Sequence, residues 1–306
     1  MATMTRRSAA IAVLLLCAVA AGLSGVPVRA QDGQTWAASI EDVRRTASMV
    51  PGPRPVRINF LKFAESRRTK NFSVEGAPTI PSIQARTAFQ VVYADGHVMV
   101  DAGMDLAVHS FFGRGVEEPY FPQAVGQVEQ AVRDARLVVV THEHGDHVAG
   151  VIHSPVAAEL ASKTILTRAQ IETLTSAPQM PEIRLTPETA ARFVVIDYDR
   201  YFPIAPGMAL IKAAGHTVGS QMVFVTLDSG REYLLIGDVS WHMDGVRLVK
   251  GKDAPWVTED TAAVMDQLAW LNELSRTEPD LVIVASHDEE QHVALTQAQL
   301  LSHRLE

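Results

Sequence analysis

The alternation of apolar and polar residues predicts two β-hairpins. In AFQVVYADGHVMVDAG, residues 88–103, two apolar runs flank the dipeptide Asp95-Gly96, which suits the positive φ angles of a tight turn. A second pair of apolar runs lies in MVFVTLDSGREYLLIGD, residues 222–238, on either side of a DSG turn. Both stretches are expected to form antiparallel strand pairs.

Helical periodicity predicts two longer helices and one short one. Valines recur three and four positions apart between residues 122 and 134, and apolar residues stay in register from 259 to 275. Thr258 is the expected N-cap of the second helix, and Thr296 is expected to cap a short helix near the end of the chain. Strands that come both in hairpins and in alternation with helices indicate an α+β fold, with sheets covered by helices.

A dense group of polar residues follows a buried strand predicted at 137–141. The hexapeptide HEHGDH contains three of the eleven histidines of the chain. His142 and His144 are two positions apart, so in an extended segment both rings lie on one side. The glycine permits a bend, after which Asp146 and His147 come on the first turn of the next element. Because imidazole and carboxylate suit zinc, iron, manganese or cobalt, we expect a metal site rather than a solvated loop.

Three further apolar strands each end in one metal-binding residue. His216 follows the strand in IKAAGHTVGS, Asp238 follows LLIG, and His287 follows LVIVAS. Functional side chains are commonly placed on the loops that a rigid scaffold holds together. We therefore expect these three residues to converge on the HEHGDH loop.

Together the motifs resemble those of the metallo-β-lactamase-fold hydrolase superfamily. The H-x-H-x-D-H loop, GHTVGS, GD and SHD come in the order of that family, between about Arg57 and His287. The resemblance implies a four-layer αββα sandwich with two mixed sheets and two metal ions at one edge. It also implies the ligands: His142, His144 and His216 for one ion, Asp146, His147 and His287 for the other, and Asp238 as a bridge.

The resemblance further implies hydrolysis. Two zinc ions per chain are expected, with iron, manganese or cobalt as alternatives. Such a pair lowers the pKa of a shared water toward neutrality, so that a bridging hydroxide can attack a carbonyl. Asp146 is the expected proton donor to the leaving group, and Glu143 is expected to face solvent or to support the loop.

Asp238 favours one branch of the family. β-Lactamases of this fold usually carry cysteine or serine at that position, whereas lactonases, glyoxalase-II-like thioesterases and phosphodiesterases carry aspartate. Only 19 residues follow His287, too few for the helical domain of glyoxalase II, and SHDEEQ is similar to the last metal loop of acyl-homoserine-lactone lactonases. The expected reaction is the opening of a lactone or ester. A β-lactamase-type amide hydrolase and a mononuclear iron sulfur dioxygenase stay open as alternatives.

Four residues are candidates for substrate contact. Lactonases carry a tyrosine three positions after the bridging aspartate, and here that position is Trp241, whose indole can donate a hydrogen bond but cannot act as an acid. The adjacent His242 could replace the tyrosine, although a surface or supporting role is favoured. Phe111 and Phe112 belong to an aromatic segment that either walls an apolar pocket or packs in the core.

The first thirty residues predict export. An arginine pair precedes an apolar run at 9–21, and the VRA at 28–30 is a cleavage site of the A-x-A type. The run is shorter than the ~20 residues of a membrane span, so no membrane attachment is expected after cleavage. Residues 31–306 are expected to form one domain in the periplasm or in secreted form; Sec and twin-arginine export both stay open.

Cleavage would leave an acidic chain without cysteine. The whole sequence has 27 basic and 35 acidic residues, for a net charge of -8, and removal of the three arginines before residue 31 gives -11. This charge disfavours nucleic acid, so the expected partner is a small-molecule substrate. Loss of Cys17, the only cysteine, excludes a disulfide and a thiolate ligand. The sequence leaves a homodimer open.

Overall fold

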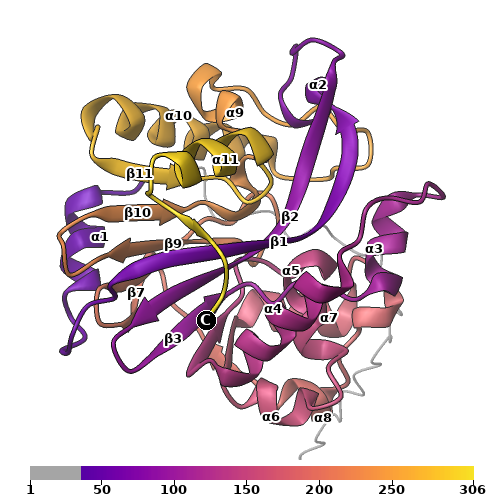
Figure 1. Ribbon diagram of the computed structural model, residues 1–306, viewed down its shortest axis with the longest axis horizontal. Coiled ribbons are helices and arrows are strands. Elements are labelled where there is room, and N and C mark those ends of the chain that lie inside the picture. The colour runs from indigo at the N-terminus through magenta and orange to yellow at the C-terminus, as the bar shows by residue number, and fades with distance from the viewer. Residues whose placement is uncertain (1–35) are drawn as a thin grey trace, which may run out of the picture. The chain divides into compact units, whose positions relative to one another are not determined.

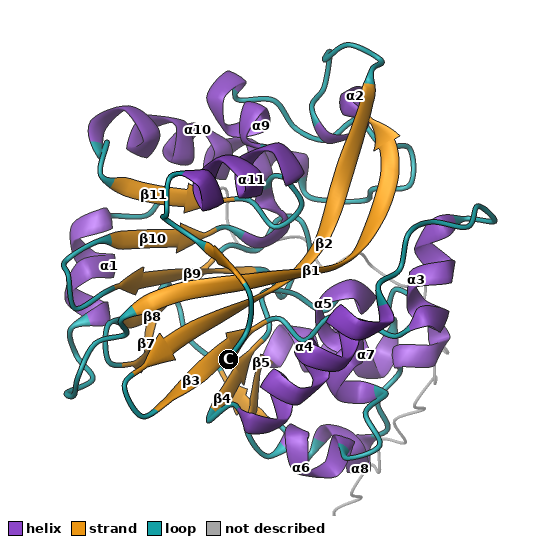
Figure 2. Cartoon of the chain, viewed as in Figure 1, coloured by secondary structure: helices purple, strands orange, loops and turns teal. Residues whose placement is uncertain are grey.

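Residues 36–306 are described by the structure, a computed structural model, and they belong to one compact unit. The predicted signal sequence lies outside the described residues. Two β-sheets pack face to face, and helices cover the outer face of each sheet (Figure 1 and Figure 2). This four-layer α+β sandwich is the fold that the resemblance implies.

The larger sheet is mixed and has the strand order β12-β1-β2-β3-β4-β5-β6. The pairs β1-β2 and β2-β3 are antiparallel, whereas β3 to β6 run parallel. The first predicted hairpin is confirmed as β2-β3, but its two turn residues are Ala94 and Asp95, one position before the predicted Asp95-Gly96. The bounds are β1 Arg57–Thr69, β2 Pro81–Tyr93, β3 Gly96–Val100, β4 Leu137–Val139, β5 Thr164–Thr167, β6 Val194–Ile196 and β12 Ser302–His303.

The smaller sheet is also mixed, in the order β11-β10-β9-β8-β7. Only β10 and β11 pair in parallel; the other neighbours are antiparallel. The second predicted hairpin is confirmed as β9-β10. The bounds are β7 Tyr201–Ala205, β8 Met208–Lys212, β9 Gln221–Thr226, β10 Glu232–Leu235 and β11 Leu281–Val284.

The predicted helix at 122–134 is confirmed as α4. Among the described residues, no helix is both long and apolar enough to cross a membrane. The helices are α1 Ile40–Ala47, α2 Lys70–Ser73, α3 Leu106–Gly113, α4 Pro122–Asp134, α5 Gly145–Ile152, α6 Ala157–Ala161, α7 Arg168–Ser176, α8 Pro187–Ala190, α9 Met243–Leu248, α10 Thr261–Thr277 and α11 Glu289–Gln297, with short 3₁₀ turns at Pro181–Ile183 and Gly237–Val239.

Strand alternation divides the core into layers. Met222 and Phe224 of β9 pack in the cluster under α1 and α10, while Val223 and Val225 pack between the two sheets. All four side chains are fully buried, and burial of such a side chain contributes ~1.5–3 kcal/mol. A third cluster joins the outer face of the larger sheet to α3, α4 and α5. The layers hold the strand ends in fixed positions at one edge.

The prediction that Thr258 caps α10 is wrong. The N-cap is Asp260, whose carboxylate accepts a hydrogen bond from the backbone of Ala263. The helix begins later than predicted because the preceding Glu259 is bonded to His216, which holds this part of the chain out of the helix.

The prediction that Thr296 caps the last helix is also wrong. The N-cap of α11 is Asp288, which accepts from the backbone of Gln291. Thr296 lies in the last turn, where its hydroxyl donates to the carbonyl of His292. A carboxylate directly after His287 starts the helix, which places the fold's last metal-binding candidate at a helix N-terminus.

Candidate metal centre

The HEHGDH loop joins β4 to α5. His144 is the N-cap residue of α5, and Asp146 and His147 lie on its first turn, as predicted. A side chain added at Gly145 would meet Val108 at 2.8 Å, so the close approach of α3 requires glycine there. The loop therefore turns sharply and brings its donor side chains together.

Three imidazoles and one carboxylate form the first donor set. They belong to His142, His144, His216 and Asp238. His144 Nδ1 lies 3.1 Å from His142 Nε2 and 3.2 Å from His216 Nε2. Asp238 Oδ2 lies 3.6 and 3.5 Å from the same two Nε2 atoms. Ligands of a tetrahedral zinc ion, bound at ~2.0–2.1 Å, lie about 3.3 Å apart, so these spacings fit one ion.

The second donor set consists of Asp146, His147 and His287. His147 Nε2 lies 3.4 Å from Asp146 Oδ2 and 3.5 Å from Asp238 Oδ1. His287 Nε2 lies 3.6 Å from the first of these oxygens and 3.1 Å from the second. The two oxygens of Asp238 thus face different donor sets, which is the arrangement of a bridging ligand.

Three buried polar atoms at this centre lack a protein partner. His147 Nε2, His287 Nε2 and Asp238 Oδ1 are buried, and none of their contacts within the described part of the chain, the 3.1 Å approach of the last two included, has the geometry of a hydrogen bond. Each unpaired buried atom costs ~1–3 kcal/mol, and divalent cations would satisfy all three. Donor chemistry, spacing and unpaired atoms therefore fit a pair of divalent metal ions.

A buried ion pair supports the first donor set from behind. His216 Nδ1 lies 3.0 Å from Glu259 Oε2, and Lys252 Nζ lies 2.9 Å from the same carboxylate oxygen. Lys252 also donates to the backbone carbonyl of Asp238 at 2.8 Å. Such partners fix the tautomer and the orientation of a ligand. Sequence reasoning missed both residues, because they lie in a loop without a recognisable motif.

The second donor set has its own supports. His147 Nδ1 lies 2.7 Å from Asp101 Oδ2, and His287 Nδ1 lies 2.7 Å from the backbone oxygen of Ala85. Asp101 also accepts from the backbone N–H of Thr141 at 2.7 Å, and this bond ends β4 two residues before the predicted limit. Asp101 follows β3 directly with φ 64°, a strained conformation typical of functional sites. Its place after an apolar strand is the signal that could have identified it.

Burial and charge set the protonation states of the donors, and these states differ between the two sets. Burial lowers the pKa of all three imidazoles of the first set, that of His144 to about 3, so they are neutral. Burial alone would raise the pKa of Asp146, but Arg86 and His147 hold it well below its usual range. Burial would lower the pKa of His147, yet Asp146 and Asp101 raise it well above its ordinary value. Without metal this imidazole therefore holds a proton, which a bound ion would displace.

Trp241 Nε1 and His242 Nδ1 are bonded to protein groups, whereas His242 Nε2 is buried without a hydrogen-bond partner among the described residues. Trp241 Nε1 donates to Asp238 Oδ2 at 2.7 Å. His242 Nδ1 accepts from the backbone N–H of Asp244 at 3.0 Å and so caps α9. Their contact with a substrate stays a prediction; the bonds observed support the donor Asp238 and the adjoining helix.

Phe111 and Phe112 take different positions on α3. Phe111 is 47 % exposed, whereas Phe112 is half-buried against the core under α5. The Phe112 ring lies 4.8 Å from the guanidinium carbon of Arg86, so it borders the second donor set. Phe112 thus both packs in the core and adjoins the site.

Glu143 lies inside the protein and supports the loop, one of the two positions expected for it. The residue is buried, and its Oε2 accepts from Thr217 Oγ1 at 2.8 Å. Burial raises the pKa of this carboxyl group. Glu143 therefore ties the HEHGDH loop to the segment that carries His216.

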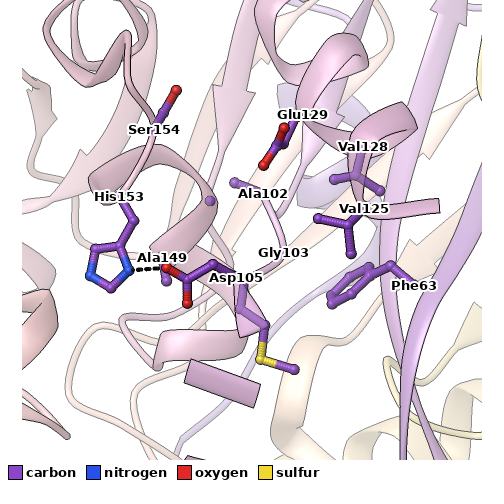
Figure 3. A pocket seen from close by; sticks show the side chains of 12 residues that line it. Phe63, Ala102, Gly103, Asp105, Val125, Val128, Glu129, Ala149, His153 and Ser154 are labelled. Atoms are coloured by element: carbon purple, nitrogen blue, oxygen red, sulfur yellow. Dashed lines mark hydrogen bonds and ion pairs between the residues drawn. The ribbon is translucent and has the colours of Figure 1, made fainter. Parts of the chain in front are cut away.

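A small cavity lies beside the C-terminal half of α5 (Figure 3). Its volume is about 30 Å³, and Phe63, Ala149 and His153 contribute to its wall. His153 is bonded to Asp105 at 2.8 Å, as Figure 3 shows. The space holds about two waters and no organic substrate. The donor sets lie at the opposite, N-terminal end of α5.

Comparison with known proteins agrees with this geometry. The sequence model of the metallo-beta-lactamase superfamily matches residues 85–287. An N-acyl homoserine lactonase from Bacillus sp is 24% identical over 213 residues, which cover 64% of this chain and 78% of that protein.

Solved structures share the fold. An N-acyl homoserine lactone hydrolase with N-hexanoyl-L-homoserine at its metal centre has a TM-score of 0.62 at 17% identity, covering 79% of this chain and 96% of the other. AidC, a dizinc quorum-quenching lactonase, has a TM-score of 0.55 at 13% identity, covering 78% and 91%. The family match over most of the chain and the two donor sets lead to one conclusion: the protein belongs to the metallo-beta-lactamase superfamily, is similar to its lactonase branch, and is a metal-dependent hydrolase.

Proposed function

We propose that the protein is an exported hydrolase that uses two zinc ions to open a lactone or ester. The observation that carries the proposal is the position of the Asp238 carboxylate between the two donor sets. Each of its two oxygens faces a separate set of three donors. The similarity to N-acyl homoserine lactonases, with AidC described as a dizinc enzyme, supports both the metal and the substrate class.

Two divalent ions held here would supply the positive charge that activates a water and polarises a carbonyl. The side chains of the protein do the rest. Asp238 fixes the spacing of the two sites. Trp241 holds its carboxylate, and Lys252 holds its backbone carbonyl. Asp146 would accept at Oδ1, the oxygen that Arg86 does not contact, the proton that the attacking water loses, and would pass it to the leaving alkoxide oxygen.

Metal analysis combined with a substrate panel tests the proposal. We expect two zinc ions per chain and fastest turnover of an acyl lactone or aryl ester among lactone, ester, nitrocefin, phosphodiester and persulfide substrates. One iron per chain with oxygen-dependent persulfide turnover would replace the hydrolase by a dioxygenase. Efficient nitrocefin turnover would replace ester opening by amide hydrolysis.

Export is a separate part of the proposal. It rests on the arginine pair, the apolar run and the VRA site of the first thirty residues. The protein recovered from the periplasm or medium of an expressing bacterium should begin at or near Gln31. Mass spectrometry that finds residues 1–30 retained would reject the cleaved signal and leave the chemistry untouched.

A further inference from the structure

Strand β2 passes directly beside the second donor set. Ala85 bonds to His287 twice, with its N–H donating to the backbone oxygen at 3.0 Å and its carbonyl accepting from Nδ1 at 2.7 Å. Thr87 Oγ1 donates to the carbonyl of Ser286 at 2.7 Å. Arg86 lies between these two anchors, so its backbone is fixed relative to the loop that carries His287.

The side chain of Arg86 contacts Asp146 and is held on three sides. Nη1 donates to Asp146 Oδ2, and Nη2 donates to Ser66 Oγ at 3.0 Å. Ser66 is a diagonal neighbour of Arg86 across β1 and β2, where Ala64 pairs with Arg86. The guanidinium carbon lies 4.8 Å from the ring of Phe112. Only 9 % of the side chain is exposed, so the contact with Asp146 is shielded from water.

We propose that Arg86 is a positioning residue for the second ion: its guanidinium fixes the carboxylate of Asp146 in the orientation that binds metal. The oxygen contacted by Arg86 is Oδ2, the same atom that lies within 3.4 Å of His147 Nε2 and 3.6 Å of His287 Nε2. One oxygen thus meets the guanidinium and the metal position together, which prevents the carboxylate from rotating.

The shape of the guanidinium matters as well as its charge. The planar fork directs Nη1 to Asp146 and Nη2 to Ser66 at once, which the single ammonium of lysine cannot do. A cation close to a metal position also repels the ion, so charge alone would weaken metal binding. The charge of Arg86 also keeps the buried Asp146 ionised, so the gain from orientation is the part that Arg86→Lys removes while the charge stays.

The inference rests on the two-ion part of the proposed function and is independent of the substrate. Zinc content is measured against a graded chelator series for the wild type, Arg86→Lys and Arg86→Met. The wild type should release its ions in two steps, which His216→Ala and His287→Ala assign by each removing one. Both Arg86 variants should weaken the second site by about 10–100-fold, the usual effect of removing a ligand's support, and leave the first site unchanged.

Glu259→Gln is the matched control, because it removes the support of His216 and should weaken only the first site. Second-site affinity equal to wild type in both Arg86 variants overturns the proposal. Retention in Arg86→Lys with loss in Arg86→Met also overturns it, since charge without the fork would then suffice. Wild-type protein with a single ion refutes the two-ion function instead.

Ser66→Ala keeps the test decisive if the Arg86 variants do not fold. It removes only the hydroxyl that holds Nη2, so we expect a several-fold weakening of the second site alone. A folded Ser66→Ala protein with unchanged second-site affinity, and no folded Arg86 variant, counts against the proposal.

Discussion

The two halves of the candidate metal centre, one around each donor set, are supported differently. The first half presents three neutral imidazoles, and behind it Glu259 and Lys252 cancel each other's charge. The second half has a carboxylate ligand of its own, a further carboxylate at Asp101, and a single arginine against them. The second half therefore contains more carboxylates, and its supports come from strand β2 and from Asp101 at the end of β3 rather than from the loop before α10. We expect a substitution in one half to weaken metal binding in that half alone, except at Asp238, which faces both donor sets.

The largest effect is expected at Asp238, because it belongs to both halves. Asp238→Ser should lower lactone or ester turnover by about 100-fold or more, since small displacements of reacting groups cost that much. Zinc content should fall at both sites. Kinetics and metal analysis check this prediction. Efficient wild-type nitrocefin turnover, with both ions and most of that activity retained in the variant, would instead favour the β-lactamase branch.

Removal of one donor should abolish metal binding at one donor set and leave the other set occupied. His216→Ala leaves the second donor set complete, and His287→Ala leaves the first complete. Each variant should therefore purify with about one ion per chain and lose most activity. Metal content per chain, measured after gel filtration, is the readout. Full occupancy in either variant would show that its histidine is not a ligand.

The convergence of the donor side chains could be predicted from sequence, and the place of Asp101 after an apolar strand offered a signal too, but the other supports could not be predicted. The motif loop and the strand-end positions of His216, Asp238 and His287 are local patterns in the chain. Arg86 lies in the middle of a strand and Glu259 in a loop, and each acts through a residue far away in sequence. Such contacts arise only when the sheets pack, so no local periodicity records them.

The N-caps of α10 and α11 were also predicted at the wrong positions. Threonine at 258 and at 296 satisfies the local preference for an N-cap residue. The positions used are Asp260 and Asp288, because metal-centre residues occupy the chain immediately before each helix. Both are aspartates, which cap a helix at least as well as threonine, so the local preference holds and the sequence only misplaced the start of each helix.

Acid should destabilise the core behind the second half. His292 of α11 is buried beside Phe60 and Phe89, and its Nε2 bonds to the carbonyl of Ala285 at 2.8 Å. Burial lowers its pKa from 6.5 to about 4. Below pH 6.5 the unfolded chain therefore binds a proton that the folded chain refuses until about pH 4, so stability falls as pH falls through this window.

Urea unfolding of chelator-treated protein at pH 7 and pH 5 measures this loss. We expect His292→Gln to remove about 2 kcal/mol of the acid-dependent decrease in the free energy of unfolding, as the two pKa values imply. Chelation excludes metal release as a cause, and the other histidines contribute equally to both proteins. The same decrease in variant and wild type would show that His292 is protonated in the folded state.

The smallest effect is expected at Trp241, which contacts both halves through Asp238. Its indole lies edge-on to His216 and His287, and its N–H donates to Asp238 Oδ2. Trp241→Phe keeps the aromatic packing and removes that single bond to a charged group, which should lower kcat by about ten-fold. If Trp241 acts by holding the bridge, KM should stay near its wild-type value.

The ratio of the two kinetic constants decides between the roles of Trp241. A rise in KM with unchanged kcat would mean that the indole binds substrate rather than holding Asp238. Substrate contact is the role that the lactonase tyrosine at this position suggested for Trp241. Trp270→Phe is the matched control, since Trp270 packs on Trp36 on the outer face of the smaller sheet and should leave both constants unchanged. Because Asp238 belongs to both halves, a bridging role also predicts that Trp241→Phe weakens both zinc sites to a similar degree, unlike Arg86→Lys or Glu259→Gln.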